Sequence, residues 1–131
     1  MRNRIGILVP VGYMLLLLGL SVIPDEGPSG RLLGWVSPNF QNLLHIPAFG
    51  FLAVLWIGVL DFYGVSEGRR ILICALITFL YGTLAELIQI WVPGRYPSIT
   101  DVLLDAAGII LFIGLYRWVK PSAWMKRISH A

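Results

Sequence analysis

Residues 71–92 read ILICALITFLYGTLAELIQIWV, and Glu86 is the only charged side chain among them. At about 1.5 Å per residue, a helix of this length can cross the hydrocarbon core of a bilayer, which is about 30 Å thick. Three further apolar blocks of similar length lie at about residues 5–23, 43–60 and 102–119. The four blocks predict an all-α, polytopic membrane protein, a four-transmembrane-helix bundle that forms a single domain over residues 1–131.

The composition excludes a soluble enzyme. The chain is 57% apolar and 13% charged, and its mean hydropathy is +0.79. Soluble domains carry about a quarter of their residues as charges, which they need to cover a water-facing surface. We therefore expect a membrane protein whose outer surface faces lipid.

The basic residues predict the orientation of the bundle. Eight of the ten Lys and Arg residues lie at the two ends of the chain and in the connection at 61–70, namely Arg2, Arg4, Arg69, Arg70, Arg117, Lys120, Lys126 and Arg127. The positive-inside rule then places both termini in the cytoplasm of a multi-pass protein of the inner (cytoplasmic) membrane. The net charge of +3 is thus an orientation signal. We expect no nucleic-acid partner, because a basic groove with interleaved aromatic residues is missing.

Two outer connections and several small residues shape the expected bundle. The connection at 24–42 is predicted to be a loop, because its Gly and Pro residues break any long helix. Glycines within the second and fourth blocks, such as Gly50 and Gly108, predict close helix crossings. Cys74, the only cysteine, is expected to serve packing and not a disulfide or a reaction.

Ionisable side chains within the blocks cluster toward one side of the membrane. Each costs at least ~2.5–3.5 kcal/mol on insertion scales, so each needs a reason to be there. His45 lies at the outer end of the second block, Glu86 and Gln89 lie in the outer part of the third, and Asp101 and Asp105 lie at the outer start of the fourth. Counted from the outer ends of their helices, Glu86 and Asp105 are expected at one depth.

These residues predict a polar pocket open to the outer side, to which the short loop at 93–98 adds Arg95. His45 or Glu86 would act as general base if the site is catalytic. The binding residues would be Gln89, Arg95, Asp101 and Asp105, with the guanidinium taking a phosphate. One histidine and several carboxylates are compatible with a metal, but a dense motif such as HExxH is missing. The sequence therefore does not determine whether the site holds a metal or another cofactor.

Each of these residues also has a structural interpretation. Asp101 would complement the dipole of the fourth helix, with Ser98 as its N-cap. Glu86 and Arg95 would form a buried ion pair. His45 would donate a hydrogen bond to a backbone carbonyl. These alternatives predict helix contacts without a binding site.

At the same residues the chain resembles the VanZ-like family of small bacterial membrane proteins. The resemblance covers residues 43–108, about half the chain, and is carried by Leu44-His45-Ile46-Pro47-Ala48-Phe49-Gly50, by Glu86 to Gln89, by Pro93-Gly94-Arg95 and Ser98, and by Asp101-Val102-Leu103-Leu104-Asp105-Ala106-Ala107-Gly108. The positions that match the polar pattern of the family are His45, Glu86, Gln89, Arg95, Asp101 and Gly108. The resemblance implies a protein of the bacterial cell envelope linked to glycopeptide antibiotic resistance.

Two positions depart from the family pattern. The family often has a Lys shortly before the histidine, where this chain has Asn42, and usually an Asn at the position of Asp105. The first departure removes a positive charge and the second adds a negative one. Together they disfavour a site for a bare anion and favour one assisted by a cation.

Three classes of function are compatible with this sequence. The favoured one is recognition or modification of a lipid or lipid-linked headgroup, so the expected partners are membrane lipids and a lipid-linked envelope precursor. The first alternative is a structural or regulatory membrane partner without catalysis. The second is an ion or proton translocator. The ionisable groups stop in the outer half of the predicted spans, which disfavours a translocator, and a four-span monomer would also have to form a homo-oligomer to make a pathway.

Overall fold

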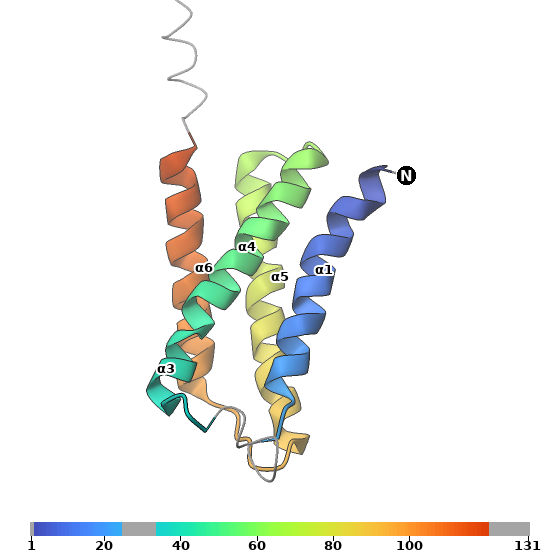
Figure 1. The fold of residues 1–131 in the computed structure, drawn as a ribbon. Helices are drawn as coiled ribbons and strands as arrows, with labels where there is room; N and C mark the ends of the chain where they lie inside the picture. Colours follow the sequence, from blue (N-terminus) through green and yellow to red (C-terminus); the bar gives the residue numbers. More distant parts are fainter. Residues whose placement is uncertain (1, 25–33, 121–131) are drawn as a thin grey trace, which may run out of the picture.

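The computed structural model describes residues 2–24 and 34–120, and in these residues every regular element is a helix. Figure 1 shows four long helices side by side, with short elements at one end. The elements are α1 (Arg2–Ser21), α3 (Pro38–Leu43), α4 (His45–Phe62), α5 (Glu67–Ile88), the 3-10 turn η1 (Gln89–Trp91) and α6 (Ile99–Val119). The expected all-α architecture is confirmed for the described part of the chain.

Three of the helical segments are long and apolar enough to cross a membrane. They are Pro38–Phe62, Glu67–Trp91 and Ile99–Val119. The apolar part of α1, Gly6–Ser21, is shorter. Three of the four expected spans are thus supported by length and composition, and the fourth stays a prediction.

Some helices begin earlier than the apolar blocks predict, because their first turns contain polar residues. The connection expected as a loop up to residue 42 contains α3, because Ser37 caps its start and Pro38 occupies its first turn. Likewise α5 begins at Glu67, in polar residues that precede the apolar block. Ser98 caps α6, as the sequence predicts, and its side chain accepts a hydrogen bond from the amide of Asp101.

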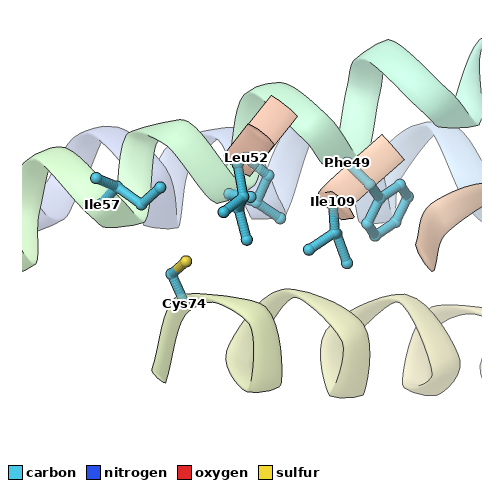
Figure 2. Close-up of a cluster of buried hydrophobic side chains, with 7 residues drawn as sticks. Phe49, Leu52, Ile57, Cys74 and Ile109 are labelled. Atoms are coloured by element: carbon cyan, nitrogen blue, oxygen red, sulfur yellow. The ribbon is translucent and has the colours of Figure 1, made fainter. Parts of the chain in front are cut away.

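The core lies where α4 meets α5 and α6. Helix α4 packs most extensively on α6, and it also contacts α5 and α1. Figure 2 shows side chains of the buried cluster, which consists of Phe49, Leu52, Ala53, Ile57, Cys74, Ile109 and Ile113. The cysteine therefore packs in the core, as expected.

Two glycines allow the close approach of α4 and α6. A Cβ atom on Gly108 would lie 2.2 Å from the carbonyl oxygen of Ile46, and one on Gly50 would lie 2.3 Å from the ring of Phe112. A side chain at either position would force the helices apart. The predicted close crossing is thus confirmed at these two glycines.

The outer face of α5 is a stripe of leucines. Leu72, Leu76, Leu80 and Leu84 follow one another at intervals of four residues, and each is at least half exposed. A contiguous apolar stripe of this length would be exposed to water in a soluble monomer, whereas in a bilayer it contacts acyl chains. This surface belongs to a membrane protein.

The two ends of the bundle carry different polar groups. Figure 1 shows the start of α1, the α4–α5 connection and the end of α6 at one end, and α3 with the α5–α6 connection at the other. At the first end the buried Arg70 pairs with Asp61, and Arg117 lies 3.7 Å from Glu67. The residues expected to form the polar pocket lie toward the second end.

Candidate functional site

A histidine and a buried carboxylate pair across two helices. His45 is the first residue of α4, and its Nδ1 lies 2.7 Å from Oδ1 of Asp105 on α6. The Asp105 side chain is only 1% exposed, whereas that of His45 is 25% exposed. The ring of Phe49 stacks on the imidazole from one turn further along α4. His45 thus binds a side chain and not the backbone carbonyl that the structural interpretation expects.

Asp105 fits because α5 has a glycine opposite it. A Cβ atom on Gly82 would lie 2.6 Å from Oδ2 of Asp105 and 3.0 Å from the ring of Phe49. Oδ2 is buried, and no described residue donates a hydrogen bond to it. The carboxylate therefore occupies the space that the missing side chain leaves, and its other oxygen is directed to His45.

Glu86 links the end of α5 to the start of α6. Its Oε2 accepts a hydrogen bond from the amide of Ser98 at 3.0 Å, and its Oε1 accepts one from Nε2 of Gln89 at 3.3 Å. Glu86 and Gln89 are both buried. These two donors are neutral, so they fix the orientation of the carboxylate without balancing its charge.

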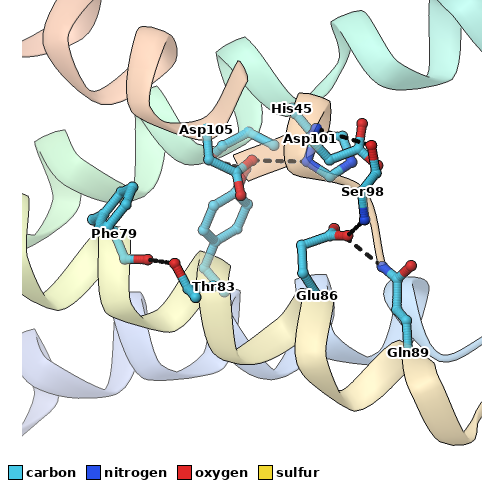
Figure 3. A network of polar contacts seen from close by, with 10 residues as sticks. His45, Phe79, Thr83, Glu86, Gln89, Ser98, Asp101 and Asp105 are labelled. Atoms are coloured by element: carbon cyan, nitrogen blue, oxygen red, sulfur yellow. Dashed lines mark hydrogen bonds and ion pairs between the residues drawn. The ribbon is translucent and has the colours of Figure 1, made fainter. Parts of the chain in front are cut away.

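Three potential ligand groups from three helices converge beside this pair. His45 of α4, Glu86 of α5 and Asp101 of α6 each offer one atom, and these atoms all lie within 4.8 Å of one another. Figure 3 shows the three side chains together, with Asp105 beside His45 and joined to it by a dashed line. Oδ1 of Asp101 is buried and accepts no hydrogen bond from a described residue.

The convergent groups form one wall of a cavity of about 250 Å³. Helix α1 contributes Leu17 and Leu20, and Phe49 adds a third apolar surface. A second hollow of about 400 Å³ lies next to it, toward the α5–α6 connection. The two share five polar lining residues, which are Gln41, Asn42, Gln89, Arg95 and Asp101.

The structure brings the six predicted site residues to one place. The cavity is lined by His45, Glu86, Gln89, Arg95 and Asp101. Arg95 also donates from Nε to the carbonyl of Ile23, just after α1, at 3.1 Å. Asp105 is behind the wall and contacts the cavity through His45.

Sequence reasoning missed the contribution of α1 and α3. Leu17 and Leu20 look like any other residues of an apolar helix, so no signal in the sequence marks them as cavity residues. Gln41 and Asn42 are polar residues of an expected loop. The family pattern offers one signal, because it draws attention to position 42.

A family model described as VanZ/LLP1 matches residues 8–120. No curated protein and no solved structure matches the chain. The matched region contains all four long helices apart from the first turns of α1, and it contains every residue of the site. The chain belongs to the VanZ/LLP1 family.

Proposed function

We propose that this protein binds the headgroup of a lipid or lipid-linked envelope precursor in the cavity between α1, α4 and α5. The observation that carries the proposal is the composition of the cavity wall. The lining combines polar residues, among them His45, Glu86 and Arg95, with apolar ones, among them Leu17 and Leu20. A ligand that fits this mixed lining has a polar head joined to a hydrocarbon chain.

The setting of the cavity is a bundle of four membrane spans with both termini in the cytoplasm. Arg69 and Arg70 lie in the first turn of α5, Arg117 lies in the last turn of α6 and Lys120 follows it. All four are at the end of the bundle where α1 also starts. The positive-inside rule places this end in the cytoplasm and the cavity on the outer side of the inner membrane. The cavity would then meet lipids of the outer leaflet.

The polar wall favours a headgroup that contains phosphate and hydrogen-bonding groups. Arg95 lines both hollows, and a guanidinium binds phosphate oxygens in a planar, two-point geometry. Gln89 would donate or accept hydrogen bonds with hydroxyl or amine groups, and the carboxylate of Glu86 would accept them. A sugar phosphate or an amine-bearing phosphate has this combination of groups.

The pairing of His45 with Asp105 adds a catalytic candidate to the binding role. A buried carboxylate that holds a histidine in one tautomer is the arrangement that general bases use. In that case His45 would take a proton from a hydroxyl or water at the headgroup, and the protein would modify its lipid. If the ligand is a cell-wall precursor, this reaction would also provide a link to glycopeptide resistance.

Mass spectrometry of the lipids that copurify with the full-length protein tests the binding role. The variant Arg95→Gln removes the proposed phosphate partner. Arg69→Gln removes an exposed arginine at the opposite end of the bundle and is the matched control. We expect wild type and Arg69→Gln to enrich one lipid species, and Arg95→Gln to lose it by about tenfold, because a hydrogen-bonded charge contributes about 1.5–3 kcal/mol.

The proposal fails if the folded wild-type protein carries only the bulk lipids of the membrane. It also fails if Arg95→Gln and Arg69→Gln retain the enriched species equally. Circular dichroism and size-exclusion profiles identify the folded variants. A structural partner without a ligand site predicts the first result, in which no lipid species is enriched.

A further inference from the structure

We propose that His45, Glu86 and Asp101 bind one divalent transition-metal cation, Zn²⁺ or Mn²⁺, on the polar wall of the cavity. The binding of the metal stands on the geometry of these three residues. Its role, which is to receive the phosphate of a headgroup, rests on the proposed function. The site belongs to the described part of the chain, and each ligand comes from a different helix.

The spacing of the three ligand atoms suits a single cation. A metal–ligand distance is about 2.0–2.2 Å, so two ligand atoms on opposite sides of one ion lie about 4 Å from each other. Ligand atoms on the same side of the ion lie closer together. The three atoms of His45, Glu86 and Asp101 already lie within 4.8 Å of one another. Small side-chain rotations would bring them to bonding distance of one ion.

Asp105 provides the support that metal-binding histidines require. A ligating histidine almost always donates its second ring N–H to a carboxylate or carbonyl, which fixes the ring and makes the ligand nitrogen more basic. Here Nδ1 of His45 is 2.7 Å from Oδ1 of Asp105. The remaining nitrogen, Nε2, is therefore the atom that would bind the metal, and in the metal-bound protein His45 would be a ligand and not a general base.

Unbalanced buried charge is the independent observation that points to a cation. Asp101 is partly exposed as a residue, but its Oδ1 is inaccessible to solvent and has no hydrogen-bond donor among the described residues. Glu86 is 3% exposed, and its described donors, Gln89 and Ser98, are neutral. Isolated carboxylates buried away from water are costly unless they are paired or coordinate a metal. A dication between Glu86 and Asp101 would satisfy both.

The donor set selects the class of metal. Carboxylates alone suit Mg²⁺ and Ca²⁺, whereas imidazole suits Zn²⁺ and other transition metals. A site with one imidazole and two carboxylates therefore favours Zn²⁺ or Mn²⁺ over Mg²⁺. Three protein ligands leave a coordination position open on the cavity side, as in catalytic zinc sites.

The metal would also resolve the electrostatic conflict within the proposed binding site. Without a cation, Glu86, Asp101 and Asp105 would repel a phosphate group that Arg95 attracts. A dication held by His45 and two of these carboxylates would supply a positive ligand position at the same wall. A phosphate could then bridge the metal and the guanidinium.

The test measures metal binding to the full-length protein after chelator treatment. Isothermal titration with Zn²⁺, Mn²⁺ and Mg²⁺ gives the affinity, and elemental analysis gives the stoichiometry. We expect one equivalent of Zn²⁺ or Mn²⁺ and weaker binding of Mg²⁺. The variants Glu86→Gln and Asp101→Asn should each lose at least about tenfold in affinity, and Asp105→Asn about 10–100-fold as a support of the histidine. Glu67→Gln, an exposed acid at the other end of α5, should bind like wild type.

A second measurement does not depend on the variants folding. Zn²⁺ or Mn²⁺ should raise the unfolding temperature of the wild-type protein, because a ligand that binds only the native state stabilises it. No saturable binding to wild type would overturn the proposal. Equal affinities for wild type, Glu86→Gln and Asp101→Asn would also overturn it.

The outcomes for metal and lipid are separable. If the chelator-treated protein retains the enriched lipid but binds no added metal, the headgroup proposal stands and the metal proposal is refuted. One equivalent of site-bound metal without any enriched lipid would support the metal and refute the headgroup proposal.

Discussion

The contact between His45 and Asp105 depends on the absence of a side chain at Gly82. In Gly82→Ala, the new methyl group would overlap Oδ2 of Asp105 and press on Phe49. We expect the carboxylate to move and the stability to fall by about 1–3 kcal/mol, the usual cost of overpacking a core. Thermal unfolding of the purified protein measures this loss, and the amount of copurifying lipid shows its effect on the site.

Gly58→Ala is the matched control for this substitution. Gly58 lies within α4, and a Cβ atom there would have no neighbour within 4 Å. Alanine is favoured over glycine within a helix by roughly 0.5–1 kcal/mol, so this variant should be neutral or slightly more stable. Similar losses for both substitutions would show that Asp105 is not held by its fit against Gly82.

Residue types alone predict the members of the site but not their partners. His45, Glu86 and Asp101 stand out because polar groups are costly within apolar blocks. The contact of His45 with Asp105, which is 60 residues away, depends on how α4 and α6 rotate against each other. The spacing of residues along the sequence does not reveal how the two helices are rotated. The sequence therefore predicts one pocket, whereas the pairing of His45 with Asp105 comes from the structure.

Among the elements, the crossing of α4 and α6 should be the most sensitive to added volume. Gly108→Ala places a methyl group 2.2 Å from the backbone oxygen of Ile46, and backbone cannot rotate away as a side chain can. We expect a loss of at least about 1–3 kcal/mol from overpacking. Gly114→Ala, on the same helix with open space around it, should unfold at or above the wild-type temperature. If Gly108→Ala is as stable as Gly114→Ala, the two helices do not cross this closely.

Helix α1 is attached through two tyrosine hydroxyls. Tyr13 of α1 donates to the carbonyl of Ala48 on α4 at 3.1 Å, and Tyr81 of α5 donates to the carbonyl of Met14. Replacing either tyrosine by Phe should lower stability by about 0.6 kcal/mol, the average for such contacts between membrane helices. The two losses should add in the double variant, because the hydroxyls bind different carbonyls.

The double variant Tyr13→Phe/Tyr81→Phe also tests the role of α1 as a cavity wall. Neither tyrosine lines the cavity, but α1 supplies Leu17 and Leu20 to it. We expect the double variant to retain less of the enriched lipid, as measured by mass spectrometry. Wild-type retention with a lowered unfolding temperature would mean that α1 stabilises the bundle without holding the ligand.

Hydropathy predicts the long helices better than their ends. The apolar blocks coincide with α1, α4, α5 and α6, because burial in lipid requires a continuous apolar helix. Polar residues occur in α3 and in the first turn of α5, so the apolar blocks begin only at residues 43 and 71. The formation of α3 is explained by Ser37 as a cap and by packing against α4 and α6.

For the whole molecule, the orientation can be measured with cysteine labelling. Tyr96→Cys places a thiol in the exposed α5–α6 connection, and Ser66→Cys places one in the α4–α5 connection. Cys74 is buried and stays in both variants as the common background. We expect a membrane-impermeant maleimide to label Tyr96→Cys on intact spheroplasts, and Ser66→Cys only after lysis. The reverse pattern would place the cavity on the cytoplasmic side.

The central claim is that the buried polar cluster is a binding site and not only a set of contacts between helices. Native mass spectrometry of wild type, Glu86→Gln and the exposed control Glu67→Gln tests it most directly. We predict one retained lipid of a single mass on wild type and Glu67→Gln, and folded but lipid-free Glu86→Gln. The account would be contradicted if all three proteins retain the same lipids, or if Glu86→Gln loses its lipid only together with its fold.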